Sequence, residues 1–247
     1  MKVLITGASS GIGYSMAKYF SSLGYDLVLV ARDKKKLDKI KKEFKSKVEV
    51  ISLDLGSIDN CIQLHDMVSD IDILVNNAGF GLFGEFSSTD LDKEIEMIRL
   101  NISAVHVLCK LYLKDMVKRD SGRILNVASI AGFMPGPLMS TYYASKNYVV
   151  RLSQAIKEEL RHYKSNVKIS VLCPGPVKTN FDNVAGVHFS LKGLDSDDVA
   201  RYAIDKMLKD KFIIIPSIKI KLLRFISKIV PDSILVRFVY KSQKRKG

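Results

Sequence analysis

The chain has 247 residues, of which 47% are hydrophobic and 26% are charged, and its formal net charge is +13. These values are ordinary for one globular α/β domain, and they exclude a collagen-like, low-complexity or largely disordered chain. Three widely separated cysteines and four histidines without partners at metal-ligand spacing predict neither a disulfide framework nor a metal site, and they favour a reducing cytoplasm.

Short β-branched apolar runs alternate with amphipathic, helical stretches along the whole chain. The apolar runs predict strands over residues 2–6, 26–31, 48–53, 72–75, 122–127, 167–172 and 212–215. Runs that are apolar throughout, such as 27–30, are typical of parallel strands covered on both faces. The pattern predicts a single-domain, doubly wound parallel sheet of the Rossmann type over residues 1–215, with 216–247 as its extension. Because the first strand starts at Lys2, we expect no cleavable export signal and a cytoplasmic location.

The first predicted strand leads directly into a turn with three glycines, Gly7, Gly11 and Gly13. In dinucleotide-binding folds the first glycine permits the tight turn, the second lets pyrophosphate approach the backbone, and the third lets the helix pack on the strand. The N-terminus of the following helix adds free N–H groups and positive potential. The turn therefore predicts a phosphate site, although glycine is also common at such turns for conformational reasons alone.

The end of the second predicted strand bears on the choice of cofactor. NAD sites carry an acidic residue about twenty positions beyond the glycine turn, and Ala31 occupies that place here. Arg32 follows, and a guanidinium at this place can pair with the additional phosphate of NADP. The basic run 34–36 adds positive charge near Arg32, although such a run is usually a solvated helix start. The negative charge of Asp33 weighs against NADP. We therefore expect NADP as the cofactor.

A candidate catalytic group lies in the second half of the chain. Tyr142 and Lys146 are one helical turn apart, and Ser129 precedes Tyr142 by thirteen residues. A nearby cation lowers a tyrosine pKa, ordinarily near 10, by about one to three units, so we expect Tyr142 to be a proton donor with a lowered pKa. Ser129 follows the fifth predicted strand, where its hydroxyl can bind a substrate carbonyl, or alternatively cap a turn. Tyr143 is the competing tyrosine, but Asn147 takes the place of a lysine at i+4.

Taken together, these motifs resemble those of the short-chain dehydrogenase/reductase family. They are Thr6 to Gly13, Asn76 to Gly79, Asn101, Ser129, Tyr142-x-x-x-Lys146 and Pro174-Gly175, in family order over residues 1 to about 210. The resemblance implies a Rossmann-type domain that transfers hydride between a nicotinamide dinucleotide and a carbonyl or alcohol. It implies that the catalytic residues are Asn101, Ser129, Tyr142 and Lys146. We expect a homodimer or homotetramer.

The resemblance also implies how the cofactor is held. It places Asp54 and Leu55 beside the adenine, the loop 77–79 along the ribose, the segment 174–179 over the nicotinamide carboxamide, and Asn101 beside a water that links Lys146 to solvent. The expected cofactor contacts are Gly7, Ser9, Ser10, Gly11, Ile12, Gly13, Arg32, Asp54, Leu55, Asn77, Ala78, Gly79, Tyr142, Lys146, Pro174, Gly175, Val177 and Thr179.

The loops that the resemblance assigns to the substrate are apolar. They contain Phe80, Leu82, Phe83, Phe133, Met134, Leu138, Met139, Phe181 and Phe189. Large apolar surfaces without an evident charge clamp favour a lipophilic ketone or aldehyde. A 3-oxoacyl thioester is the alternative substrate, and a non-catalytic NADP-binding regulatory or scaffold protein is the alternative of another class.

The C-terminal segment carries most of the net positive charge, since residues 207–247 contain eleven Lys or Arg and two Asp. It predicts amphipathic helices, with Lys221, Arg224 and Lys228 on one face and, at helical spacing on another, Ile218, Leu222, Phe225, Ile226 and Ile229. Such a tail is too short to span a bilayer but can lie on one. A helix packed on the domain or on a partner subunit is the alternative, and nucleic acid is disfavoured because no known binding motif accompanies the charge.

Overall fold

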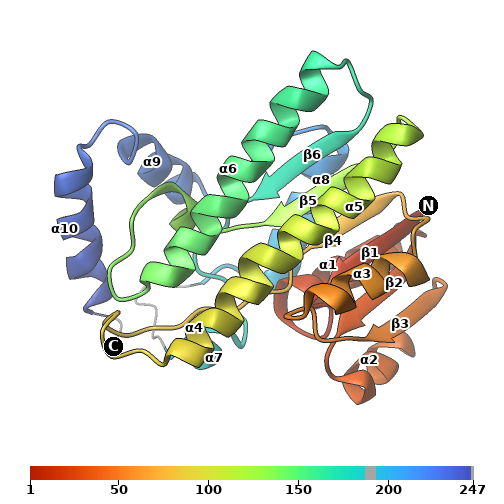
Figure 1. Ribbon diagram of the computed structural model, residues 1–247, viewed down its shortest axis with the longest axis horizontal. Helices are drawn as coiled ribbons and strands as arrows, with labels where there is room; N and C mark the ends of the chain where they lie inside the picture. Colours follow the sequence, from red (N-terminus) through yellow and green to blue (C-terminus); the bar gives the residue numbers. More distant parts are fainter. Residues whose placement is uncertain (187–192, 246–247) are drawn as a thin grey trace.

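The computed structural model describes residues 1–186 and 193–245, and a seven-stranded parallel sheet lies at its centre (Figure 1). The strands are β1 (Lys2–Thr6), β2 (Asp26–Ala31), β3 (Val48–Ser52), β4 (Ile73–Asn76), β5 (Arg123–Val127), β6 (Lys168–Leu172) and β7 (Ile213–Ile214). Their order across the sheet is β3-β2-β1-β4-β5-β6-β7. Each predicted strand is present, with boundaries that differ from the predicted ones by at most one residue.

Helices cover both faces of the sheet, as the continuously apolar strands predict. One face is covered by α1 (Gly11–Ser22), α2 (Lys34–Lys41) and α8 (Ser196–Leu208), and the other by α3 (Ile58–Met67), α5 (Val105–Lys118) and α6 (Ser140–His162). Successive strand residues alternate between the two cores: Ile5 packs in the core that contains Phe20, and Leu4 in the core that contains Tyr112. The doubly wound fold is therefore confirmed.

The strand order reverses between β1 and β4, and two loops meet at this point. The Thr6 hydroxyl oxygen accepts hydrogen bonds from the backbone N–H groups of Asn77 (2.9 Å) and Ala78 (3.0 Å). The Asn77 side chain donates in turn to the Thr6 carbonyl at 2.9 Å. These bonds hold the glycine turn after β1 against the loop after β4. Ligands of open α/β sheets bind at such a switch point.

The remaining helical elements surround this edge of the sheet. Helix α4 (Leu91–Ile98) continues through a π-helical turn η1 (Arg99–Ala104) into α5, and a 3-10 turn η2 (Ile130–Phe133) precedes α6. The short helix α7 (Phe181–Ala185) follows β6. Asn101 lies in η1 and is completely buried. Insertions of this kind widen one helical turn and are often found at functional sites.

The C-terminal segment forms two helices, α9 (Ile218–Ile226) and α10 (Asp232–Gln243), which lie together at one end of the molecule (Figure 1). They pack on the domain through Ile220, Leu235 and Val239, which are at most 8% exposed. Within the described part of the chain, no helix has both the length and the apolar character needed to cross a membrane.

Candidate active site

A cavity of about 800 Å³ lies at the carboxyl ends of the strands, walled by the segments after β1 to β6 and by α9 and α10. Two predicted site residues, Gly13 and Asn101, are not part of its wall. The predicted residues that the wall does contain are Gly7, Ser9, Ser10, Gly11, Ile12, Arg32, Asp54, Leu55, Asn77, Ala78, Gly79, Ser129, Tyr142, Lys146, Pro174, Gly175, Val177 and Thr179.

The glycine turn leaves open space in front of the N-terminus of α1. Gly7 and Gly11 have φ values of +65° and +53°, a region that other residues rarely adopt. A Cβ on Gly7 would lie 2.9 Å from the Ala78 Cα, and one on Gly13 would lie 2.4 Å from the Gly7 carbonyl oxygen. Ser10 makes no side-chain capping bond among the described residues, so the first N–H groups of α1 are left for a ligand. These features fit the pyrophosphate of a dinucleotide.

Asn101 is buried next to the cavity wall without being part of it, and its side chain holds a loop of the wall in place. Its Oδ1 accepts a hydrogen bond from the Phe80 N–H at 3.1 Å, and its Nδ2 donates to the Phe80 carbonyl at 2.9 Å and to Ser145 Oγ at 3.1 Å. A Cβ on Gly79 would approach Asn101 Oδ1 to 2.7 Å. The side chain thus fixes the loop after β4 against α6, beside the lysine that the same helix carries.

Three of the predicted catalytic side chains meet in the cavity wall. Tyr142 and Lys146 come from α6, and Ser129 follows β5. The Lys146 Nζ lies 5.8 Å from the Tyr142 ring centre and donates to the Val127 carbonyl at 3.0 Å. Ser129 Oγ accepts a hydrogen bond from the Ala131 N–H at 3.2 Å and so caps η2. Its own hydroxyl proton remains available for donation to another partner.

The expected lowered pKa of Tyr142 is wrong for this structure. Burial raises the pKa of Tyr142 to about 12, although hydrogen bonding with Ser129 opposes the rise. Burial also lowers the pKa of Lys146 to about 8. The prediction counted the cation but not the loss of water around both groups, and desolvation favours the neutral form of each. Tyr142 is therefore a protonated phenol near neutral pH, which is the form that a proton donor needs.

Tyr143 also lines the cavity, but its hydroxyl has a structural partner. Gln243 Nε2 from α10 donates a hydrogen bond to it, and burial raises the pKa of Tyr143. The neighbouring Asn147 uses its side-chain amide on backbone carbonyls, among them that of Tyr143 at 2.9 Å. Tyr143 thus joins α6 to α10, whereas Tyr142 lies beside Lys146, as their i+4 spacing predicts.

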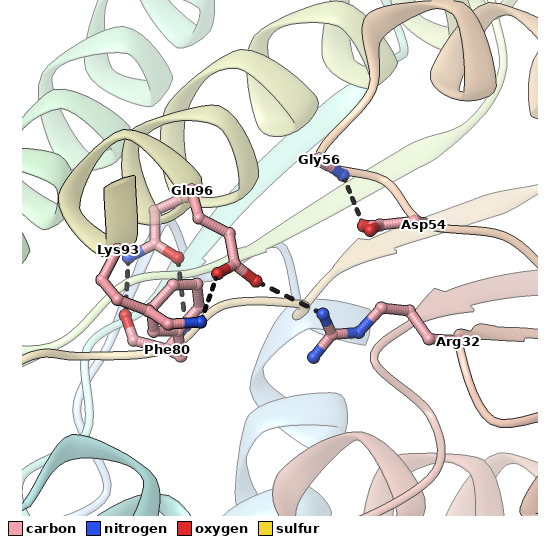
Figure 2. Close-up of polar contacts among 7 residues, drawn as sticks. Arg32, Asp54, Gly56, Phe80, Lys93 and Glu96 are labelled. Carbon is pink, nitrogen blue, oxygen red and sulfur yellow. Dashed lines mark hydrogen bonds and ion pairs between the residues drawn. The ribbon is translucent and has the colours of Figure 1, made fainter. Parts of the chain in front are cut away.

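Charged side chains lie at the end of the cavity that follows β2, where one ion pair joins this segment to α4 (Figure 2). Arg32 Nη1 lies 3.3 Å from Glu96 Oε1, and Glu96 Oε2 lies 3.0 Å from Lys93 Nζ. Asp33, which weighed against NADP in the sequence, accepts a hydrogen bond from the Lys36 N–H at 3.0 Å and so caps α2. Glu96 was not predicted as a site residue, because nothing local in the sequence connects α4 with the end of β2.

The loop after β3 supplies the predicted adenine neighbours. Asp54 Oδ1 accepts a hydrogen bond from the Gly56 N–H at 3.0 Å (Figure 2), and the Asp54 carbonyl accepts from Asn60 Nδ2 at 2.8 Å. Leu55 is 4% exposed and packs in the core. Both residues reach the cavity wall, and the two bonds fix the shape of the loop there.

The other end of the cavity is largely apolar. Of the predicted substrate neighbours, Phe83, Phe133 and Leu138 are not in the wall, and Phe189 lies outside the described residues. Those in the wall are Phe80, Leu82, Met134, Met139 and Phe181. The C-terminal helices also contribute to the wall, which was not predicted from the sequence; their residues there are Ile220, Leu223, Leu235, Phe238, Val239, Ser242 and Gln243. Leu235, Val239 and Gln243 have the i, i+4, i+8 spacing of one buried helical face. This pattern could have indicated the contact, but the polar Gln243 makes the face harder to recognise as buried.

Comparisons with known proteins agree with this arrangement. The family model for short chain dehydrogenases matches residues 1–186. An uncharacterized oxidoreductase of Staphylococcus epidermidis is 33% identical over 71% of this chain and 77% of its own. The human very-long-chain 3-oxoacyl-CoA reductase is 37% identical over 64% of this chain and 54% of its own.

Solved structures are similar as well. A short-chain dehydrogenase from Sphingobium yanoikuyae in complex with NADPH has a TM-score of 0.82 at 32% identity, over 88% of each chain. The bulky-bulky ketone specific alcohol dehydrogenase from Comamonas testosteroni has a TM-score of 0.77 at 29% identity, over 88% of this chain and 86% of its own. A short-chain dehydrogenase/reductase from Burkholderia phymatum in complex with NAD, 24% identical over 90% and 91% of the two chains with a TM-score of 0.82, shares the fold.

Proposed function

Because the chain belongs to the short-chain dehydrogenase/reductase family, we propose that it is an NADP-dependent oxidoreductase that reduces the carbonyl of a lipophilic substrate to an alcohol. One observation carries this proposal. Tyr142, whose pKa is raised by burial, lies with Lys146 beside it in one cavity between the glycine turn and a largely apolar wall.

The residues present give each catalytic group a task. When bound, NADPH supplies the hydride that the carbonyl carbon accepts. Tyr142 donates its proton to the carbonyl oxygen, and the Ser129 hydroxyl hydrogen-bonds that oxygen as it gains charge. Lys146, 5.8 Å from the ring centre, stabilises the phenolate that remains. Asn101 holds the loop after β4 against α6, beside Lys146. In the oxidative direction the same groups act in reverse.

The charges after β2 support NADP. Arg32, Lys36 and Lys93 all lie in the cavity wall at this end, and a guanidinium pairs well with a phosphate. The Asp33 carboxylate is engaged in capping α2. A similar solved structure contains NADPH. Ala31 occupies the position at which NAD sites carry an acidic residue that binds the ribose hydroxyls.

The apolar wall supports a lipophilic substrate, and two similar proteins act on such compounds according to their names, a 3-oxoacyl-CoA reductase and an alcohol dehydrogenase specific for bulky ketones. We expect the purified protein to oxidise NADPH with bulky ketones or aldehydes, and to use NADH or small polar carbonyls of similar reactivity poorly. The measurement is absorbance at the cofactor band across a panel of ketones, aldehydes and 3-oxoacyl thioesters. Turnover of the thioesters alone would favour the alternative substrate, and NADPH binding without any turnover would favour a scaffold.

The outer face of the tail supports contact with a membrane. The apolar stripe predicted in the sequence is exposed: Ile218, Leu222, Phe225 and Ile229 are 59% to 81% exposed, because α9 packs through Ile220 instead. Exposed residues Ile234 and Phe238 of α10 extend the set. We call these six residues the outer apolar face. Arg224, expected on the solvated basic face, lies instead over the Phe133 ring at 4.7 Å.

We propose that the outer apolar face rests on an anionic membrane surface. Exposed cations occur in the same two helices and in the turn between them, at Lys219, Lys221, Lys228, Arg237 and Lys241, and each basic residue at an anionic membrane surface contributes about 1 kcal/mol. A second copy of this chain would bring two basic faces together, so the charge favours lipid. Phe238 belongs both to this face and to the cavity wall, so under this proposal one side of the cavity lies near the membrane surface. Assembly as a homodimer or homotetramer stays a prediction.

Vesicle co-sedimentation tests this contact. We expect binding to vesicles that contain phosphatidylserine but not to pure phosphatidylcholine, with loss at high salt because the attraction is screened. A Leu222→Ser/Phe225→Ser variant should bind roughly tenfold or more weakly, because it removes apolar area that enters the interface. The matched control is Ile58→Ser/Ile62→Ser, which removes an exposed apolar pair from α3. Absence of binding at low salt, or equal losses in both variants, would leave the tail as a packing or subunit-contact element.

A further inference from the structure

Glu96 connects α4 with the end of β2 across the cavity. Its carboxylate pairs with Arg32 at 3.3 Å, although 64 positions separate the two residues in the chain. Both side chains lie in the cavity wall, and Figure 2 shows Arg32 extended toward α4. Within the part of the chain that the structure describes, Glu96 is the acidic partner of Arg32. The guanidinium that would bind a phosphate is thus already occupied by a carboxylate.

We propose that Glu96 is a specificity-determining residue that competes with the 2′-phosphate of NADP for Arg32 and so limits the preference for NADP over NAD. This inference rests on the proposed use of NADP. Binding of the phosphate requires Arg32 to exchange one anionic partner for another. NAD has a hydroxyl at that place and draws no such benefit from Arg32.

The other charges at this end determine how large the competition is. Arg32, Lys36 and Lys93 are the cations of the wall there, and Asp33, Asp54 and Glu96 are the carboxylates. The first two carboxylates accept hydrogen bonds from backbone N–H groups, so they are held in their own loops. Glu96 keeps Lys93 as a partner at 3.0 Å when Arg32 leaves.

The exchange of partners by Arg32 is therefore expected to change the NADPH affinity by a small but measurable factor. The Arg32 and Glu96 side chains are 67% and 38% exposed, and ion pairs with this exposure change an equilibrium constant by at most roughly fivefold. Repulsion between the carboxylate and a doubly charged phosphate acts in the same direction. Removal of the Glu96 charge is thus expected to strengthen NADPH binding by roughly threefold to tenfold.

Direct titration of the full chain with NADPH and NADH, by cofactor fluorescence or calorimetry, tests the proposal without a turnover assay. Glu96→Gln should tighten NADPH roughly threefold to tenfold and leave NADH within about twofold, with a smaller gain at high salt. Asp92→Asn is the matched control, since it removes an exposed carboxylate of α4 that is not in the cavity wall. This control should change neither affinity.

An Arg32→Ala series separates this proposal from the proposed function. Arg32→Ala alone should weaken NADPH by roughly ten- to hundredfold and change NADH little, because it removes a charge-assisted phosphate contact. In that background, Glu96→Gln should lose most of its effect. Equal losses of NADPH and NADH in Arg32→Ala would contradict the use of NADP itself. A selective loss in Arg32→Ala, together with unchanged or weaker NADPH binding in Glu96→Gln, would overturn only the role of Glu96.

Discussion

Replacement of Tyr142 by phenylalanine is expected to reduce kcat for carbonyl reduction by roughly 10²- to 10⁴-fold, which is the contribution of a general acid. In the proposed mechanism the hydroxyl of Tyr142 is the proton source, and phenylalanine keeps the ring that packs against Phe181 at 5.4 Å between centres. NADPH affinity should stay within about tenfold, because the phenol serves proton transfer more than binding. Steady-state kinetics with the best carbonyl of the panel and a separate NADPH titration measure the two quantities.

The adjacent tyrosine provides a matched control for this variant. Tyr143→Phe removes a hydroxyl from an equally buried ring, 6.1 Å away between centres. Its hydroxyl is the acceptor for Gln243 Nε2, so its loss should lower the thermal midpoint slightly and leave most of kcat. Near-normal activity of Tyr142→Phe, or an equal loss of kcat in both variants, would mean that Tyr142 is not the proton donor.

The parallel sheet was predictable because its signal is local. Each strand is a short apolar run, and the glycine turn and the Tyr142–Lys146 spacing depend on residues close together in the chain. The packing of the tail was harder to predict, because it depends on contacts with distant parts of the chain: Arg224, expected on a basic face, lies over the Phe133 ring. Helix α9 carries apolar residues on more than one side, so periodicity alone does not reveal that Ile220 is buried while Ile218 is 81% exposed.

The electrostatics of the site were the hardest part to predict. The sequence shows that a lysine follows Tyr142 by one turn, but it does not show how much water remains around either group. Burial reverses the expected direction of the Tyr142 pKa and also moves that of Lys146. The Arg32–Glu96 pair joins residues 64 positions apart, and the π-helical turn that turns Asn101 inward has no recognised sequence pattern. Such features follow from tertiary contacts.

Lys146→Ala should damage both catalysis and cofactor binding, unlike Tyr142→Phe. Loss of the cation beside the phenol removes stabilisation of the phenolate, which we expect to lower kcat by roughly 10²- to 10³-fold, as loss of one charge-stabilising donor does. We also expect Lys146 to donate a hydrogen bond to the cofactor, so its loss should weaken NADPH by roughly ten- to hundredfold. Kinetics and titration of the same variant measure both effects.

The pH profile gives Lys146 a signature that a structural role would not produce. The pKa of Lys146 is about 8 and that of Tyr142 about 12. Below pH 8 the lysine is a cation and the phenol is protonated, so both have the form that reduction requires. As the pH rises through 8 the lysine loses its charge while Tyr142 keeps its proton, so kcat/KM for NADPH, which reports the free enzyme, should fall above about pH 8. The residual activity of Lys146→Ala should lack this decline. A decline near pH 8 that persists in Lys146→Ala would assign the titration to another group, and a wild-type profile that is flat to pH 10 would show that the charge on Lys146 is not needed.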